Sequence, residues 1–308
     1  MSGLLSLGLG LGLSKASSQG ASSLTPRIFL LIGQSNMVGR ASFDGGSVHP
    51  SLVMQLGRGA PNDGVLIPTS IPLEHVDPHG GDMGLDITFS IDWAAANPFR
   101  SLILVPSADG GTSLGSGTWQ KAGERYEDAV SRANAAMASV PGATFAGFLW
   151  HQGEADTNNQ NYQSQLDQMI ADFRSDVTGA ANAPFILGGF SDDYVGSSSG
   201  RIAMRDIVLD TPNRVPDTAV ANASDLTVFD GVHFDAPSLR TLGTRYFAAF
   251  ASIAITAPSA VGAIPDQTDV LALAPPVAVG SIPDQTDLAS LAPPAAVGAI
   301  PDQMDVAA

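Results

Sequence analysis

Four short segments of the chain carry residue types that could together perform acyl transfer: residues 33–36 (GQSN), 107–119 (SADGGTSLGSGTW), 150–156 (WHQGEAD) and 230–235 (DGVHFD). A serine at its ordinary pKa is a weak nucleophile, so it needs a base within hydrogen-bond reach and a third group that holds the base. His233 is the candidate base for Ser35. Asp230 lies three residues before His233, and in a turn this spacing lets its carboxylate reach the imidazole nitrogen that faces away from the serine. The resulting order Ser, Asp, His is one of several that build this geometry.

Acyl transfer also needs hydrogen-bond donors for the oxyanion that forms at the attacked carbonyl. The main-chain N–H groups of Ser35 and of Gly110 or Gly111 are candidates, and the side-chain NH2 of Gln152 is a third. Removal of one such donor typically raises the barrier by about 2.7–4 kcal/mol. Glu154 is a second candidate for the acid that orients His233, and the spacing favours Asp230.

Several of these residues also have a purely structural interpretation. Ser35 could cap the helix that follows it, which is a common role for serine. His151 is interpreted as a structural hydrogen-bonding residue under the site. Trp119 is either a packing residue or part of a sugar site, and Arg40 either pairs with an acid or contacts substrate.

A metal site is a weaker alternative. His75 and His79 lie four residues apart with acids nearby, which is a spacing seen in metal sites. Pro78 lies between them and disfavours a helix. We therefore expect no metal site at this spacing.

The elements that must position these residues alternate along the chain. Apolar runs predict buried strands at residues 28–32, 102–106, 145–150 and 185–187. Helical periodicity predicts helices at residues 124–140, 162–177 and 238–254. This alternation predicts a doubly wound α/β sheet, in which ligands bind beyond the carboxyl ends of the strands. The four segments are expected to meet at that edge.

The motifs GQSNM, the Gly-Gly loop, WHQGEAD and DGVH resemble those of the SGNH hydrolase superfamily. Within it, they are similar to carbohydrate esterases related to sialate O-acetylesterase and acetyl xylan esterase. The resemblance implies a flavodoxin-like three-layer α/β/α sandwich with a central parallel sheet, and removal of O-acetyl groups from sugars without metal or cofactor. By position, it implies Ser35 as the nucleophile, Gly110 or Gly111 and Gln152 as oxyanion donors, and Asp230 with His233 as the remaining triad.

Composition excludes several classes of partner and site. The chain has 308 residues, of which 44% are hydrophobic, and 14 Lys and Arg against 30 Asp and Glu give a net charge of −16. Such a charge repels phosphate backbones, so nucleic acid is not an expected partner. There is no cysteine, which excludes disulfides and thiolate sites. No apolar run is long enough to span a membrane.

Both ends of the chain differ from the middle. Residues 1–25 form a Gly/Leu-rich arm, interpreted as an anchoring or docking arm, with a cleaved signal peptide as the alternative. Residues 26–256 form the expected esterase domain. Residues 257–308 contain three acidic, proline-containing copies with a period of 18 residues, marked by Ile264, Ile282 and Ile300. These repeats are either a disordered linker or tail, or an irregular docking tail for a protein partner, which a symmetric partner would bind with avidity.

The expected function is a serine esterase that deacetylates carbohydrate through an acyl-enzyme. The repeats and the arm suggest an extracellular or virion-associated setting, such as a phage tail acting on envelope polysaccharide. The alternative is a non-catalytic glycan-binding adhesin, or a structural appendage protein, on the same fold.

Overall fold

The computed structural model describes residues 25–77 and 82–256. Its centre is a seven-stranded sheet in the order β4-β3-β6-β1-β7-β8-β9. The strands are β1 Arg27–Gly33, β3 Val53–Leu56, β4 Leu66–Pro68, β6 Leu102–Pro106, β7 Thr144–His151, β8 Phe185–Gly188 and β9 Thr218–Ala221. Neighbours from β3 to β9 pair in parallel, whereas the edge strand β4 is antiparallel to β3. A small antiparallel pair, β2 Ala41–Ser42 and β5 Asp82–Met83, accompanies this sheet.

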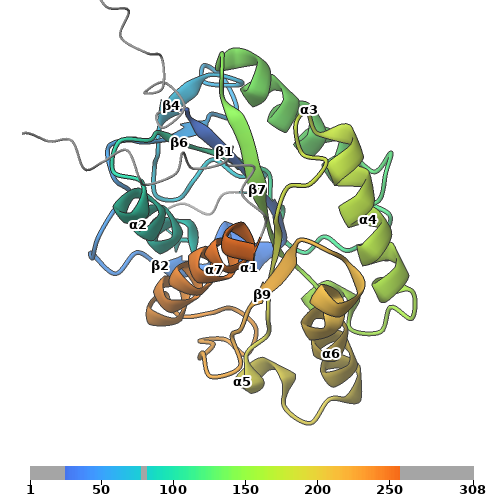
Figure 1. Cartoon of the computed structure of the whole chain (residues 1–308). Coiled ribbons are helices and arrows are strands. Elements are labelled where there is room, and N and C mark those ends of the chain that lie inside the picture. The colour runs from blue at the N-terminus through green and yellow to red at the C-terminus, as the bar shows by residue number, and fades with distance from the viewer. Residues whose placement is uncertain (1–24, 78–81, 257–308) are drawn as a thin grey trace, which may run out of the picture. The chain divides into compact units, whose positions relative to one another are not determined.

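Helices cover both faces of the sheet (Figure 1). The long helices are α2 Asp86–Ala96, α3 Glu124–Ser139, α4 Tyr162–Asp176, α6 Ser199–Arg214 and α7 Ala236–Thr256. Residues of α3, α4 and α6 pack in one apolar core and residues of α2 and α7 in the other. The predicted three-layer α/β/α sandwich is therefore confirmed, with a sheet that is parallel except at its β4 edge.

Strand β1 shows why an unbroken apolar run predicts a buried central strand. Its side chains alternate between the two faces, so Ile28 and Leu30 belong to the core beneath α3 and α4, and Phe29 and Leu31 to the core beneath α2 and α7. All four are fully buried. A strand covered on both faces needs apolar residues at every position.

The predicted elements are confirmed to within two residues at their ends. The four predicted strands are β1, β6, β7 and β8, and the three predicted helices are α3, α4 and α7. The sequence analysis missed β3, β4, β9, α2 and α6. Helix α6 contains Pro212 and buries few residues, Met204, Val208 and Thr211, so it lacks a clear apolar stripe.

The order of the strands brings three loops to one place. Strand β1 lies between β6 and β7, because the chain runs from β1 outward to β3, returns to β6 beside β1, and then crosses to β7 on the other side. The carboxyl ends of these three strands meet where the direction of winding changes, which is the usual position of a ligand site in such sheets. The loops after β1, β6 and β7 carry Ser35, Gly110 and Gln152 respectively.

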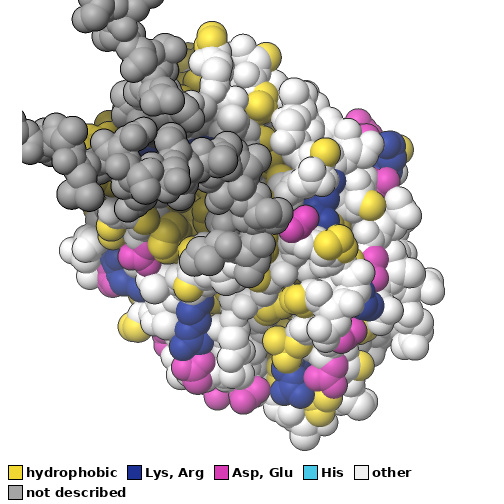
Figure 2. All heavy atoms as spheres, in the orientation of Figure 1, with side chains coloured by type: hydrophobic (Ala, Val, Ile, Leu, Met, Phe, Trp, Pro, Cys, Tyr) yellow, Lys and Arg dark blue, Asp and Glu magenta, His cyan; other side chains and the backbone are white. Residues whose placement is uncertain are grey.

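The surface of the described part is charged and mixed. Basic side chains adjoin acidic ones on the face shown in Figure 2, and ion pairs such as Arg245 with Asp225 and Arg205 with Asp192 join them. Within residues 25–77 and 82–256, no helix has the length and apolarity that crossing a membrane requires.

Candidate active site

The nucleophile candidate Ser35 lies on a sharp turn between β1 and the short helix α1 Ser35–Val38. The turn requires Gly33, which has φ +125° and whose added Cβ would lie 2.1 Å from the carbonyl oxygen of His151. The N–H of Gln34 donates to that same carbonyl at 2.8 Å. Strand β7 thus holds the turn, and it leaves Ser35 6% exposed at the end of the sheet.

Ser35, His233 and Asp230 form a continuous hydrogen-bonded chain. The Nε2 of His233 lies 2.9 Å from the Oγ of Ser35, and the Nδ1 of His233 lies 2.7 Å from the Oδ2 of Asp230. Each bond is short enough for proton transfer between its partners. The side chain of Ser35 is bound to His233, and no side-chain cap bond is present at the start of α1. The capping interpretation of Ser35 is therefore wrong.

The carboxylate of Asp230 is held in place by its own turn. Its Oδ1 accepts the main-chain N–H of Val232 at 3.0 Å and of His233 at 2.8 Å. Partial burial raises the pKa of Asp230, but the hydrogen bonds from the N–H and the ring of His233, together with that from Val232, outweigh it and lower this pKa to about 2. Asp230 is therefore ionised at neutral pH. Its charge favours the tautomer of His233 that carries a hydrogen on Nδ1, so that Nε2 can accept the serine proton.

Glu154, the other predicted acid for His233, lies in a different environment. It begins the short 3₁₀-helix η2 Glu154–Asp156 after β7, and its Oε1 accepts the Nδ2 of Asn36 at 2.6 Å. The Nδ1 of His233 is bonded to Asp230 instead. Between the two candidates that the sequence left open, the structure places Asp230 on the imidazole.

The sequence left open whether Asn36 contacts substrate or only stiffens the turn, and it was not among the predicted site residues. Its Nδ2 also donates to the carbonyl of Val232 at 3.2 Å, and its Oδ1 accepts the N–H of Phe234 at 3.2 Å. These bonds grip the chain on both sides of His233. The position of Asn36 directly after the nucleophile was the available signal, but its partners lie almost two hundred residues away.

The main-chain donors expected for an oxyanion are present at the site. Among the described residues, the N–H groups of Ser35, Gly110 and Gly111 have no protein acceptor. The loop after β6 is fixed by the N–H of Asp109, which donates to the carbonyl of Gly33 at 3.0 Å. A Cβ on Gly110 would lie 2.3 Å from the Nη2 of Arg40, so the absence of a side chain lets this loop pack closely.

Gln152 differs from the prediction that it donates to the oxyanion. It is fully buried, and its Nε2 faces three protein acceptors: Asp156 Oδ2 at 2.7 Å, Gln34 Oε1 at 3.1 Å and the carbonyl of Thr112 at 3.2 Å. The short bond to a carboxylate fixes the orientation of the amide, because a reversed amide would set two acceptors against each other. Both hydrogens of its NH2 are therefore directed at the protein, and Gln152 supports the turn at Gln34.

Asp156, which the sequence analysis did not predict as a site residue, also supports the turn at Gln34. Its carboxylate accepts the N–H groups of Leu114 and Gly115 at 2.7 and 2.8 Å as well as Gln152. It thereby ties the loop after β6 to the loop after β7. Nothing in a lone aspartate after HQGE indicates these partners.

The remaining candidates have structural positions. Trp119 is fully buried and packs edge-to-face on Trp150 at 5.4 Å between ring centroids, so the packing interpretation is confirmed and it does not line a sugar site. Arg40 pairs with Asp77 at 2.9 Å. His151 is fully buried, as expected of a residue under the site.

The suggested metal spacing involves His75, which is described, and His79, which lies outside the described residues. The Nδ1 of His75 accepts the N–H of Ala108 at 3.0 Å, and burial lowers the pKa of His75 to about 3. Residues 25–77 and 82–256 contain no cluster of three potential metal ligands.

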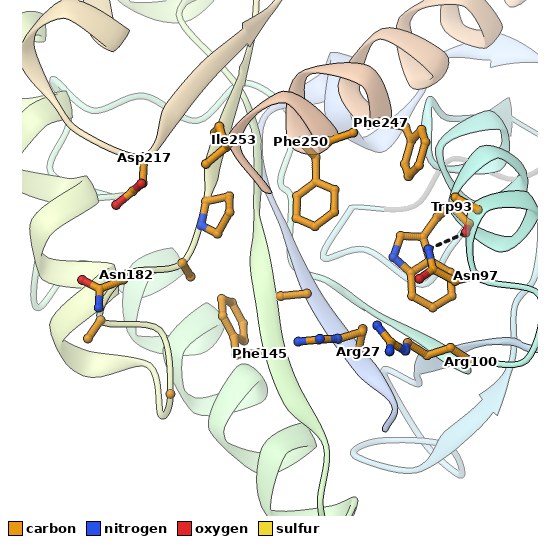
Figure 3. Close-up of a pocket in the computed structure, with 17 residues that line it drawn as sticks. Arg27, Trp93, Asn97, Arg100, Phe145, Asn182, Asp217, Phe247, Phe250 and Ile253 are labelled. Atoms are coloured by element: carbon orange, nitrogen blue, oxygen red, sulfur yellow. Dashed lines mark hydrogen bonds between the residues drawn. The ribbon is translucent and has the colours of Figure 1, made fainter. Parts of the chain in front are cut away.

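A large hollow of the described part lies away from the triad. It has a volume of about 770 Å³ and lies at the amino ends of the strands, where Arg27 begins β1 and Phe145 lies near the start of β7. Figure 3 shows Phe247 and Phe250 of α7 and Trp93 of α2 on its wall, with Arg27 and Arg100 side by side below them. The triad lies at the opposite ends of the same strands.

Several solved structures share this fold. A protein from Arabidopsis thaliana has a TM-score of 0.64 at 21% identity, covering 74% of this chain and 98% of its own. NanS has a TM-score of 0.64 at 18% identity, covering 75% of this chain and 98% of its own. A carbohydrate acetylesterase from Xanthomonas citri has a TM-score of 0.57 at 16% identity, covering 74% of this chain and 56% of its own. At these identities the likeness shows the fold.

A comparison with curated protein sequences finds no match to this chain. A family match, in contrast, covers almost the whole described part. Residues 25–252 match the family described as carbohydrate esterase, sialic acid-specific acetylesterase. The chain therefore belongs to the carbohydrate esterase, sialic acid-specific acetylesterase family, and it is a carboxylic ester hydrolase.

Proposed function

We propose that the protein removes O-acetyl groups from sugars through an acyl-enzyme on Ser35. The observation that carries this proposal is the hydrogen-bonded chain Ser35–His233–Asp230, with bonds of 2.9 and 2.7 Å. A protein that only bound acetylated sugar would need neither a base on its serine nor an acid on that base. Family membership supports the carbohydrate acetyl ester as the substrate class.

In the first half of the reaction, the Oγ of Ser35 attacks the acetyl carbonyl carbon while the Nε2 of His233 takes the serine proton. The carbonyl π-bond pair moves to oxygen, giving a tetrahedral oxyanion. When this intermediate collapses, the C–O bond to the sugar breaks and His233 gives its proton to the leaving sugar oxygen. Ser35 then carries the acetyl group.

Water completes the cycle by the same steps. His233 takes a proton from the water that attacks the acetyl-serine, and the second tetrahedral intermediate collapses with return of that proton to Ser35. Acetate leaves. Asp230 stays ionised throughout and stabilises the positive imidazolium that forms in both halves.

The oxyanion would be held by main-chain donors. The unpaired N–H groups of Ser35 and of Gly110 or Gly111 support this assignment. Because they are fixed by the turn at Gly33 and by the Asp109 hydrogen bond, they need little reorganisation when charge develops.

Phe229 supports a sugar as the group that carries the ester. Its side chain is 56% exposed, and its ring centroid lies 6.2 Å from that of His233 at an interplanar angle of 32°. Its N–H donates to the carbonyl of His233 at 2.9 Å, so the main chain that carries the ring is fixed beside the base. An exposed aromatic face offers apolar area against which the C–H face of a sugar can pack.

The central experiment measures acetate release from acetylated sugars by the parent protein and by Ser35→Ala. We expect the substitution to lower kcat by about 10⁴–10⁶-fold while the protein stays folded. Retained turnover would refute the acyl-enzyme. If the parent protein binds acetylated sugar and releases no acetate, the glycan-binding alternative holds instead.

The sugar specificity has its own test. Phe229→Ala should raise KM for an acetylated pyranoside much more than KM for ethyl acetate, whereas Phe229→Tyr should behave like the parent. Phe99→Ala is the matched control, because Phe99 is 79% exposed but lies before β6, at the other end of the sheet. Equal effects of Phe229→Ala on both esters would exclude a sugar contact.

We further propose that the enzyme acts outside the cell or on a virion, against envelope polysaccharide, with the repeats of residues 257–308 docking a protein partner. The recurrence of Ile264, Ile282 and Ile300 in register supports docking; these positions lie outside the described residues. Deletion of residues 259–308 should abolish assembly with the partner and leave acetate release intact. Survival of both would make the repeats a passive tail.

A further inference from the structure

Two buried titratable side chains beneath the triad, His151 and Glu154, take no part in the proton transfers above. The side chain of His151 is fully buried and that of Glu154 is 4% exposed, and the Nε2 of His151 lies 3.6 Å from the Oε1 of Glu154. Among the described residues, neither the Nε2 of His151 nor the Oε2 of Glu154 has a hydrogen-bond partner. Buried polar atoms of this kind require an explanation.

The hydroxyl of Tyr246 fixes the protonation of the other ring nitrogen of His151. Tyr246 donates its single hydrogen to the carbonyl of Trp150 at 2.7 Å. Toward the Nδ1 of His151, 3.1 Å away, the hydroxyl can therefore only accept, so Nδ1 carries a hydrogen. In a neutral ring, the Nε2 lone pair would then face the carboxylate of Glu154, and two facing acceptors in a buried place are unfavourable.

Glu154 connects this pair to the proposed base. Its Oε1 accepts the Nδ2 of Asn36 at 2.6 Å. Asn36 in turn binds the carbonyl of Val232 and the N–H of Phe234, at 3.2 Å each. The residues that flank His233 are thus held by an amide whose own orientation is set by a buried carboxylate.

We propose that His151 is an imidazolium that forms a buried ion pair with Glu154, and that this pair positions His233 through Asn36. The inference rests on the proposed function, since positioning His233 matters only if His233 is the base. His151 and Glu154 touch no reacting atom and are positioning residues. The extra proton on His151 removes the clash between facing acceptors, and the ionised Glu154 makes its bond to Asn36 charge-assisted.

The surroundings of the pair are consistent with this charge arrangement. Burial raises the pKa of Glu154, but the nearby ring of His151 and the hydrogen bond from Asn36 outweigh burial and keep that pKa below its ordinary value. The titratable groups near the pair include the hydroxyls of Tyr162, Tyr194 and Tyr246, whose pKa values burial raises, and the carboxylate of Asp156, which accepts the Nε2 of Gln152. The hydroxyls stay neutral, and the Asp156 carboxylate is already bound by the N–H groups of Leu114 and Gly115 and by Gln152.

The first test reads the proton directly. In the full chain with ¹⁵N-labelled histidine rings at pH 8, we expect both ring nitrogens of His151 to be protonated. His75 is the internal contrast, because it is also buried, has no such carboxylate bond and has its pKa lowered to about 3. Signals can be assigned by elimination with substitutions at the other four histidines, so no variant at His151 needs to fold. An unprotonated nitrogen on His151 would overturn the ion pair.

The second test reads the positioning. Glu154→Gln keeps an acceptor for Asn36 but removes the charge, so it should neutralise His151 and lower kcat by about tenfold, the effect of exchanging a charge-assisted bond for a neutral one, with KM unchanged. Asn36→Ala should lower kcat further. Because both changes act through one contact, the double variant should be no worse than Asn36→Ala. Multiplied losses, or an unchanged kcat in Glu154→Gln, would overturn the positioning role.

These results separate the inference from the proposed function. If Ser35→Ala retains turnover, the acyl-enzyme fails, whereas the protonation of His151 is still decided by the ¹⁵N spectrum. If Ser35→Ala is inactive and Glu154→Gln is fully active, the positioning role fails alone.

Discussion

The two ends of the central sheet carry different kinds of side chain. At the carboxyl end, buried polar side chains such as Ser35, Asn36 and Gln152 are joined by hydrogen bonds across three loops. At the amino end, a hollow of about 770 Å³ is lined by aromatic rings, with Arg27 and Arg100 beside them. There, burial and the charge of Arg100 lower the pKa of Arg27.

The difference shows what each kind of contact can do. Hydrogen bonds depend steeply on distance and angle, so a network of them can fix Ser35 and His233 within reach of each other. Apolar contacts are non-directional and tolerate a hollow of this size. We therefore expect substitutions at the carboxyl end to change chemistry and substitutions at the amino end to change stability.

The largest expected effect is that of Asp230→Asn at the carboxyl end of the sheet. We compare it with Asp217→Asn at the amino end. Asp230→Asn removes the charge that holds the tautomer of His233, and kcat should fall by about 10⁴-fold. Asp217 lines the amino-end hollow, and the same substitution there should leave kcat unchanged. Acetate release under saturating substrate measures both. A small loss for Asp230→Asn would return Glu154 to consideration as the orienting acid.

A second pair of substitutions, Phe250→Ala at the amino end and Phe229→Ala at the carboxyl end, compares effects on stability with effects on catalysis. Phe250 packs edge-to-face on Phe29 with ring centroids 5.0 Å apart, so Phe250→Ala should lower the free energy of unfolding by about 1–3 kcal/mol without changing kcat. Phe229→Ala, at an exposed position, should leave the free energy of unfolding nearly unchanged and raise KM for an acetylated pyranoside. Thermal unfolding and acetate release on the same samples test this, and a loss of kcat in Phe250→Ala at a temperature where it is folded would contradict it.

The smallest expected effect is the pH dependence of stability at Asp230. Its pKa is about 2 in the folded protein, below its ordinary value of about 3.9. A depressed pKa gives a contribution to stability that is present above about pH 4 and is lost as pH falls toward 2. As the pH falls from 5 to 2, the melting temperature of the parent should therefore decrease relative to that of Asp230→Asn. It should be small, because the Asp230 side chain is 40% exposed.

Much of the fold could be predicted because central parallel strands are covered on both faces. Runs such as residues 28–32 and 102–106 have no polar residue. Such runs are typical of a strand that is buried between two helix layers. Edge elements had no such signal. Strand β9, Thr218–Ala221, is only partly buried, and its four residues of moderate hydrophobicity look like many loops.

The site was predictable in its residue types and less so in its contacts. GQSN, HQGE and DGVH each follow or precede a recognisable element, so their meeting at one edge could be expected. The direction of the NH2 of Gln152 could not, because it is set by Asp156 and Gln34, one four residues ahead and one 118 residues back. The hydrogen bonds of Asn36 to Val232 and Phe234 could not be predicted for the same reason.

The sequence by itself determined the alternation of four central strands with three of the long helices, the two-sided burial of β1, and the presence of a serine, a histidine and acids at strand ends. Only the tertiary structure decided which of those polar atoms are partners. Ser35 and His233 are separated by 198 residues, and a hydrogen bond between them requires that their positions agree to a fraction of an ångström. That agreement comes from the packing of β1 against β7 and from the grip of Asn36 on both neighbours of His233, which no local pattern of residues encodes.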